Sequence, residues 1–188
     1  MRVDGVWGNA VTVEGYSYQC GYCDKEVAPN KGYYCKEGNV YKRAVIGICP
    51  NCNLPTVLDA SGEMQAPSPR KGKNVDHLPT EIDKLYQEIR GCYSQNAYTA
   101  SVLLARKILM NVSVYLGADE DKRFQYYVDY LDTEGYIPRN SKGWVDIIRK
   151  KGNEATHELP DINKKDAEDV LAFTEMLLKI IYEFPART

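Results

Sequence analysis

Long apolar runs, a strong charge of one sign and a secretory leader pattern are all missing from this sequence of 188 residues. No stretch approaches the roughly 20 apolar residues that a transmembrane helix needs. Residues 1–5 lack the apolar core of a signal peptide. The formal net charge of -2 is not the basic signature of a protein that binds nucleic acid over its whole surface. We therefore expect a cytoplasmic protein that has no membrane partner.

Several familiar catalytic motifs are missing as well. The sequence has no Gly-x-Ser-x-Gly motif, no phosphate-binding P-loop and no Gly-rich dinucleotide fingerprint. It contains only two histidines, His77 and His157. His77 lies beside Leu78 and Pro79, where we expect an exposed side chain without a catalytic role.

Cysteine, in contrast, is well represented, because four of the six cysteines form two Cys-x-x-Cys pairs. The pairs are Cys20 with Cys23 and Cys49 with Cys52. Each pair predicts a tight turn that points two sulfur atoms at one place, and two such turns complete a tetrahedral shell of four thiolates. Because four sulfurs leave no position for water, we expect one structural Zn²⁺ per chain. Chance spacing or a redox pair is less favoured, since a redox motif needs only one pair at a helix start.

The two remaining cysteines and the tyrosines of this region have simpler explanations. Cys35 is either a substitute ligand or a small buried thiol in a strand, and we favour the buried thiol. Cys92 is expected to lie on the first helix and to pack in the core of the helical domain. The tyrosines could stack on unpaired bases or could cover the metal site, and we favour the second function. They are Tyr16, Tyr18, Tyr22, Tyr33, Tyr34 and Tyr41.

The chain is expected to be an α+β protein in three parts. Residues 1–58 carry strand-like runs at 11–13 and 41–48, and we predict a small β-rich zinc ribbon there. A domain this short buries little core, so a metal staple makes physical sense. Residues 59–78 contain prolines and no periodicity, which predicts an extended linker. Residues 79–188 have helical periodicity throughout.

Five helices with short connections predict a compact bundle in the third part. Thr80 and Asp83 resemble a capping box at the start of the first helix, and Asn163 is the expected cap of the last. The first expected helix begins at about residue 80 and ends at about Gly91 or Ser94, and the others cover about 96–116, 119–133, 144–158 and 166–184.

Three polar residues on the expected fourth helix suggest chemistry. Arg149, Asn153 and His157 are spaced by four, which places them on one stripe. An Arg holds phosphate oxygens and a His moves a proton near neutral pH, so the stripe suits a phosphodiester site that needs no metal. The alternative is that Asn153 and His157 make buried hydrogen bonds within the bundle, and spacing alone favours this alternative.

The helical part resembles DUF4145, a HEPN-like family found with restriction and phage-defence systems. The residues that carry the resemblance are Leu78-Pro79, 85–88, Cys92, 100–109, Trp144, Ile148-Arg149, Gly152-Asn153, His157-Glu158 and 182–185. The resemblance covers roughly residues 78–186 and implies a HEPN-like bundle that forms a homodimer through its helical domain. An N-terminal zinc-binding segment is also common in that family.

The resemblance further implies a function on RNA, because active HEPN proteins are metal-independent endoribonucleases with an Arg–His site. By this resemblance His157 transfers the proton, Asn153 is its polar neighbour and Arg149 binds phosphate. The basic side chains expected to contact nucleic acid are Arg106, Lys150 and Lys151.

One departure from the active motif leaves an alternative open. Gly152 stands where the motif has Arg, and Arg149 lies eight residues before His157 instead of five. The first hypothesis is thus a defence- or toxin-associated ribonuclease. The second is a non-catalytic zinc-ribbon adaptor that binds nucleic acid or a protein partner of a defence system.

Overall fold

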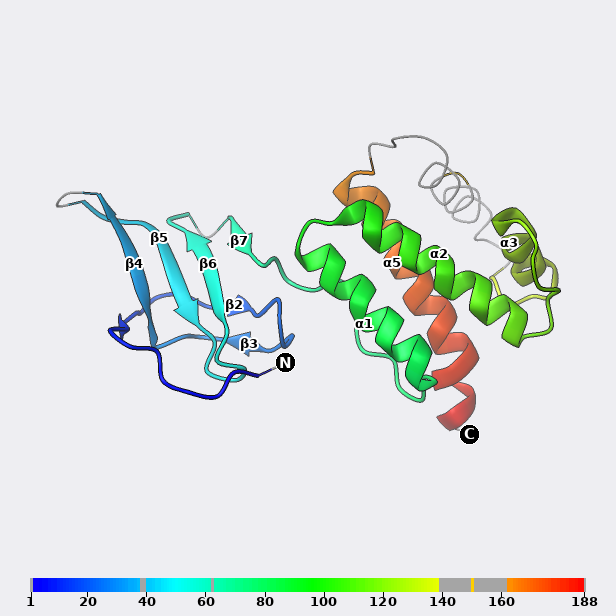
Figure 1. Cartoon of the computed structure of the whole chain (residues 1–188), viewed down its shortest axis with the longest axis horizontal. Coiled ribbons are helices and arrows are strands. Elements are labelled where there is room, and N and C mark those ends of the chain that lie inside the picture. The colour runs from blue at the N-terminus through cyan, green and yellow to red at the C-terminus, as the bar shows by residue number, and fades with distance from the viewer. Residues whose placement is uncertain (1, 38–39, 62, 139–149, 151–161, 188) are drawn as a thin grey trace. The chain divides into compact units, whose positions relative to one another are not determined.

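The computed structural model describes residues 2–37, 40–61, 63–138, 150 and 162–187 (Figure 1). The chain divides into two compact units, Met1–Arg70 and Lys71–Thr188. The first is built of strands and the second of helices, so the α+β class predicted from the sequence is confirmed. Across the described part of the chain, no helix has the length and apolar character needed to cross a bilayer.

Seven short strands form two antiparallel sheets in the first unit. The five-stranded sheet has the order β1-β4-β5-β6-β7, and β2 pairs with β3 separately (Figure 1). The strands are β1 Val11–Thr12, β2 Tyr18–Gln19, β3 Glu26–Val27, β4 Lys31–Glu37, β5 Val40–Ile48, β6 Pro55–Asp59 and β7 Gln65–Ala66. The two runs predicted as strands therefore coincide closely with β1 and β5.

The pairing of β4 with β5 positions the second cysteine pair. Gly32 of β4 lies opposite Gly47 of β5. A Cβ atom on Gly32 would lie only 2.1 Å from the carbonyl oxygen of Ile46, so this close pairing requires glycine. The strand β5 ends at Ile48, and Cys49 follows immediately.

Helices α1 to α3 and α5 form the second unit. They span α1 Thr80–Ser94, α2 Tyr98–Tyr115, α3 Phe124–Thr133 and α5 Lys164–Leu178, which continues as a π-helix over Lys179–Glu183. Four of the five expected helices are thus present among the described residues. The fifth, expected at about 144–158, lies outside them except for Lys150, which is helical.

The apolar faces of these helices meet in one core. Figure 1 shows α5 running beside α1 and α2. The most deeply buried side chains include Ile89, Ile108, Leu109, Val128, Leu171, Phe173 and Leu177. In α2 the buried residues Val102, Ala105, Leu109 and Val112 are spaced by three or four, which follows the helical period and is why the bundle could be predicted from periodicity.

Of the two predicted N-terminal helix caps, only the cap of α5 is confirmed. Asn163 accepts a hydrogen bond from the backbone N–H of Asp166 at 3.0 Å, and the Asp166 carboxylate accepts the N–H of Asn163, so the predicted cap is confirmed. The predicted capping box of Thr80 is wrong. Pro79 occupies the cap position, and α1 has no side-chain cap, because Thr80 already lies inside the first turn.

A buried arginine fixes the chain that leads into α1. Arg90 is 2% exposed, and it donates to the carbonyl oxygens of Lys71 and Gly72 and to Oδ1 of Asn74 at 2.6–3.1 Å. Val75 joins the helical core. This part of the expected linker 59–78 is therefore held against the helices, because its carbonyls supply the partners that a buried guanidinium requires.

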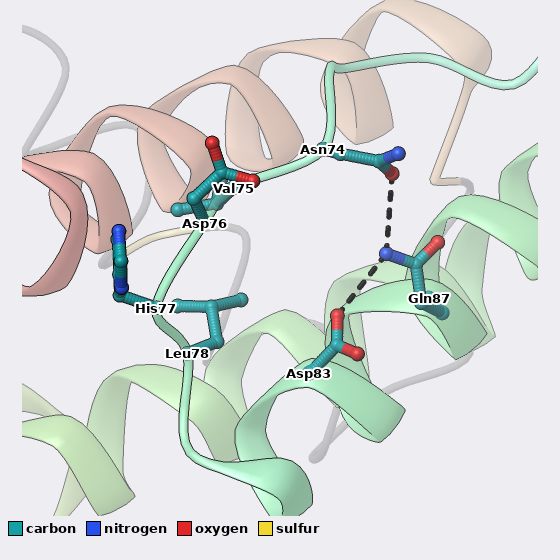
Figure 2. Close-up of a pocket in the computed structure, with 7 residues that line it drawn as sticks. All are labelled: Asn74, Val75, Asp76, His77, Leu78, Asp83 and Gln87. Atoms are coloured by element: carbon teal, nitrogen blue, oxygen red, sulfur yellow. Dashed lines mark hydrogen bonds between the residues drawn. The ribbon is translucent and has the colours of Figure 1, made fainter.

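A polar pocket of about 300 Å³ lies between this segment and α1 (Figure 2). The Gln87 amide nitrogen donates to Oδ1 of Asn74 at 3.3 Å and to Oδ1 of Asp83 at 3.2 Å. His77, also on the pocket wall, is exposed as predicted. The polar side chains on the α1 side thus bind one another and tie the segment to the helix.

A tyrosine–carboxylate pair links α1 to α5. The Tyr93 hydroxyl donates to Oε1 of Glu168 at 2.5 Å, and Lys71 lies 3.6 Å from the same carboxylate. The Tyr93 hydrogen bond lowers the pKa of Glu168, partial burial opposes it, and Lys71 and Lys164 lower it further. A carboxylate whose pKa is lowered by folding stabilises the fold above its unfolded pKa, and this contribution disappears as the pH falls.

Replacing Tyr93 by Phe is expected to lower the free energy of unfolding of the helices by about 1–2 kcal/mol at pH 7. The loss should shrink as the pH falls through the folded-state pKa of Glu168, which lies below the unfolded value of about 4.3, because the carboxyl group is then protonated in both states. Urea unfolding followed by circular dichroism at pH 7 and pH 2.5 measures both values. Tyr98→Phe is the control, since it removes only an exposed hydroxyl bonded to Asn96. An equal loss at both pH values would contradict the assignment.

Candidate metal centre

The two Cys-x-x-Cys pairs form two turns with the same backbone pattern. The N–H of Cys20 donates to the carbonyl of Lys25, and the N–H of Asp24 donates back to the carbonyl of Cys20, both at 2.9 Å. The second turn repeats these bonds one for one. The N–H of Cys49 donates to the carbonyl of Leu54 at 3.0 Å, and the N–H of Asn53 donates to the carbonyl of Cys49 at 2.8 Å.

Both turns depend on a residue with left-handed backbone geometry directly after the second cysteine. Asp24 has φ 62° and Asn53 has φ 60°. Asp and Asn tolerate this region better than other residues that carry a side chain. The full sequence signal for these paired turns is therefore Cys-x-x-Cys-Asx, in which the Asp or Asn residue adds to what the cysteine spacing alone indicates.

The four sulfur atoms converge on one point. All lie within 4.8 Å of one another, and the Sγ–Sγ distances are 3.7 Å for Cys20 with Cys52 and 3.7 Å for Cys23 with Cys49. Tetrahedral bonds of about 2.3 Å to a central ion place sulfurs roughly 3.8 Å apart, whereas a disulfide needs about 2.05 Å. The cluster could therefore bind a metal ion, and its geometry is compatible with zinc.

Burial and backbone donors surround these sulfurs. Cys20, Cys49 and Cys52 are almost wholly buried, and burial raises the pKa of the Cys20 and Cys52 thiols. Burial also acts to raise the pKa of Cys23, but the N–H of Lys25 and the side chain of Asn51 outweigh it and lower that pKa to about 7. A divalent cation would supply the positive charge that buried thiolates need.

The tyrosines of this unit mostly cover the core. Tyr18 is buried among the cysteines, its hydroxyl donates to the carbonyl of Gly47 at 3.3 Å, and burial raises its pKa to about 12. Tyr16, Tyr22 and Tyr34 pack against the same cluster. This arrangement confirms, for these four, the interpretation that the aromatic side chains shield the site.

The other two cysteines stay outside the cluster. Cys35 is exposed on β4, so the prediction of a buried thiol there is wrong. It was based on strand-like flanks, but residues in a strand alternate between the two faces, and Cys35 lies on the outer one. Cys92 is partly buried on α1.

The N-terminal loop closes over the second turn, which the sequence analysis missed. The Asn53 amide nitrogen donates to the carbonyls of Val3 and Gly5 at 2.9 and 3.0 Å. The Trp7 indole N–H donates to the carbonyl of Asn53 at 3.1 Å, and the N–H of Val3 donates to the backbone carbonyl of Cys52. No periodic pattern marks such a loop, so only the three-dimensional structure could identify it.

The predicted site of the helical unit is described only in part. Arg149, Lys151, Asn153 and His157 lie outside the described residues. Lys150 is exposed. The guanidinium of Arg106 stacks over the Phe124 ring, 4.5 Å from its centre, and partial burial lowers the pKa of Arg106.

Comparison with protein families now bears on the second unit. Residues 87–188 match the family model described as domain of unknown function DUF4145. The chain belongs to the DUF4145 family. Within this DUF4145 chain, the matched region includes Arg106 and the stripe from Arg149 to His157, whereas both cysteine pairs precede it. Neither a curated protein nor a solved structure matches the chain.

Replacing Cys20 or Cys49 by Ser is expected to reduce the bound metal from about one ion per chain to near zero and to unfold residues 1–70, because the ligand set is broken. The helices should stay folded, since their core contains no residue of the first unit. Elemental analysis and hydrogen exchange measure the two effects.

The matched control is Cys35→Ser, which alters a cysteine outside the cluster and should leave metal content and exchange unchanged. Full metal content in the Cys20→Ser protein would contradict the four-cysteine assignment.

Proposed function

We propose that the four cysteines bind a structural zinc ion and that the helical unit binds and cleaves RNA without using that ion. The observation that carries this proposal is the closed sulfur cluster. Four thiolates fill a tetrahedral zinc shell, so the ion has no open position on which to activate water. Hydrolytic chemistry then falls to side chains of the helical unit.

The Arg149–Asn153–His157 stripe is the proposed catalytic group. His157 would accept the proton of a ribose 2′-hydroxyl, whose oxygen attacks the adjacent phosphorus. The bond to the 5′-oxygen breaks, a proton goes to that leaving oxygen, and a 2′,3′-cyclic phosphate remains. Arg149 would stabilise the negative charge on the phosphate oxygens, and Asn153 would orient the proton-transferring group.

The proposed RNA contacts are Lys150 and Lys151, which adjoin Arg149 in the sequence, and Arg106 of α2. Lys150 is exposed, which suits a phosphate contact. Arg106 is held by stacking on Phe124 and is still partly exposed, so its guanidinium loses little freedom when it binds a phosphate. Lys151 is the third proposed contact. The near-neutral net charge fits a localised site rather than a broad basic surface.

The resemblance to HEPN-like proteins supports the biological part of the proposal. We place this chain among proteins of restriction or phage defence, acting as a homodimer in which the helical units pair their Arg and His side chains. Membership of DUF4145 is consistent with this placement and assigns no activity by itself.

A second function is a non-catalytic adaptor that binds nucleic acid or a defence protein. One specific observation favours it: Gly152 stands at the position of the arginine in the active motif, and Arg149 lies eight residues before His157 instead of five. Such a site could retain phosphate binding while losing cleavage.

Cleavage of RNA by the purified protein, without added metal, is expected to fall at least 100-fold in the His157→Ala variant. The matched control is His77→Ala, which removes the other histidine, an exposed one, and should cleave like the original protein. Products are identified by their 2′,3′-cyclic phosphate ends, and zinc content is measured in each preparation.

Absence of cleavage on structured and unstructured RNAs, with zinc bound and helices folded, would contradict the ribonuclease function. RNA binding that survives in that case, and weakens in Lys150→Ala or Arg106→Ala, would support the adaptor.

A further inference from the structure

Residues 65–70, here called the strap, lie against the first cysteine turn. The strap begins with β7, which pairs with β6. The Gln65 amide nitrogen donates to the carbonyl of Gln19 at 2.7 Å, and Nε of Arg70 donates to the carbonyl of Gly21 at 3.1 Å. The carbonyl groups of the two residues that flank Cys20, Gln19 and Gly21, are therefore both bound by strap side chains.

Gly21 shows how closely the strap approaches. A Cβ atom at this position would lie 2.4 Å from the carbonyl oxygen of Ser68 and 2.9 Å from that of Pro67. Both neighbours are backbone atoms, which cannot turn aside as a flexible side chain can. The strap backbone thus occupies the space that any other residue at position 21 would fill.

The turn itself does not require glycine there. The equivalent position in the second turn is Pro50, which carries a side chain and is exposed. Gly21 also lies outside the positive-φ region where glycine is favoured. Since the two turns share one hydrogen-bond pattern, the difference between Gly21 and Pro50 is explained by the strap, which covers the first turn.

We propose that the strap and the metal centre are coupled, so that each stabilises the other. Bound metal would fix the Cys20 turn and present its two flanking carbonyls to Gln65 and Arg70. The docked strap would in turn hold Cys20 in its ligating position and slow release of the ion. Coupling of this kind is reciprocal by thermodynamic necessity. The inference rests on the proposed zinc occupancy and is independent of any action on RNA.

The test compares Gly21→Ala with Pro50→Ala, which places the same residue at the equivalent, exposed position of the second turn. Pro50 is exposed although the N-terminal loop contacts Asn53 of the same turn, so the control differs from the test position in lacking the strap. Zinc content is measured first, followed by the rate of zinc transfer to excess chelator and by hydrogen exchange at the amides of Ser68 and Arg70. Gly21→Ala should transfer zinc roughly ten-fold faster and exchange these amides faster. Pro50→Ala should match the original protein in both measurements.

A second variant, Gln65→Met, removes the amide donor without touching the turn and should also transfer zinc faster. If Gly21→Ala fails to fold, the zinc transfer rate of Gln65→Met alone tests the coupling between the strap and the metal centre. Transfer rates equal to that of the original protein in the variants that fold would overturn the coupling. Absence of zinc from the original protein would instead overturn the proposed zinc occupancy, and the coupling with it.

Discussion

The convergence of four cysteine sulfurs is the constraint on which the first unit depends. Among the described residues its buried cluster has nine members, and three of them are Cys20, Cys49 and Cys52. So small an apolar core cannot by itself offset the entropy of ordering a chain of this length. A metal ion bound by the four sulfurs would add the missing stabilisation and join two turns that lie far apart in the sequence. Tyr18 packs in this cluster, and the N-terminal loop is hydrogen-bonded to the second turn.

The second unit is stabilised differently, by an apolar core and by a few buried polar ties. Arg90 binds the carbonyls that precede α1, and Tyr93 binds Glu168 of α5. Among the described residues of this unit, the buried polar side chains all have hydrogen-bond partners, as a low-dielectric interior requires. The contrast between the units agrees with the two proposed roles: a structural metal site in the first unit, and the proposed chemistry in the helical unit that matches the family.

The sequence predicted what depends on local patterns. Cysteine spacing identified the four cysteines that converge, helical periodicity located α1, α2, α3 and α5, and Asn163 marked a helix start. It could not predict what depends on contacts between distant segments. The strap lies more than 40 residues from Gly21, and Trp7 reaches Asn53 across 46 residues. The exposure of Cys35 depended on strand register, where a shift of one residue reverses the face. The catalytic assignment of His157 stays a prediction.

The most direct measurement is X-ray absorption at the zinc edge, on full-length protein purified without added metal. The account predicts one zinc ion per chain surrounded by four sulfur atoms at about 2.3 Å, with no nitrogen or oxygen ligand. A shell of mixed ligands would show that the four cysteines do not form a closed centre and would return the metal to a possible catalytic role. Absence of zinc would contradict the account of how the first unit is stabilised.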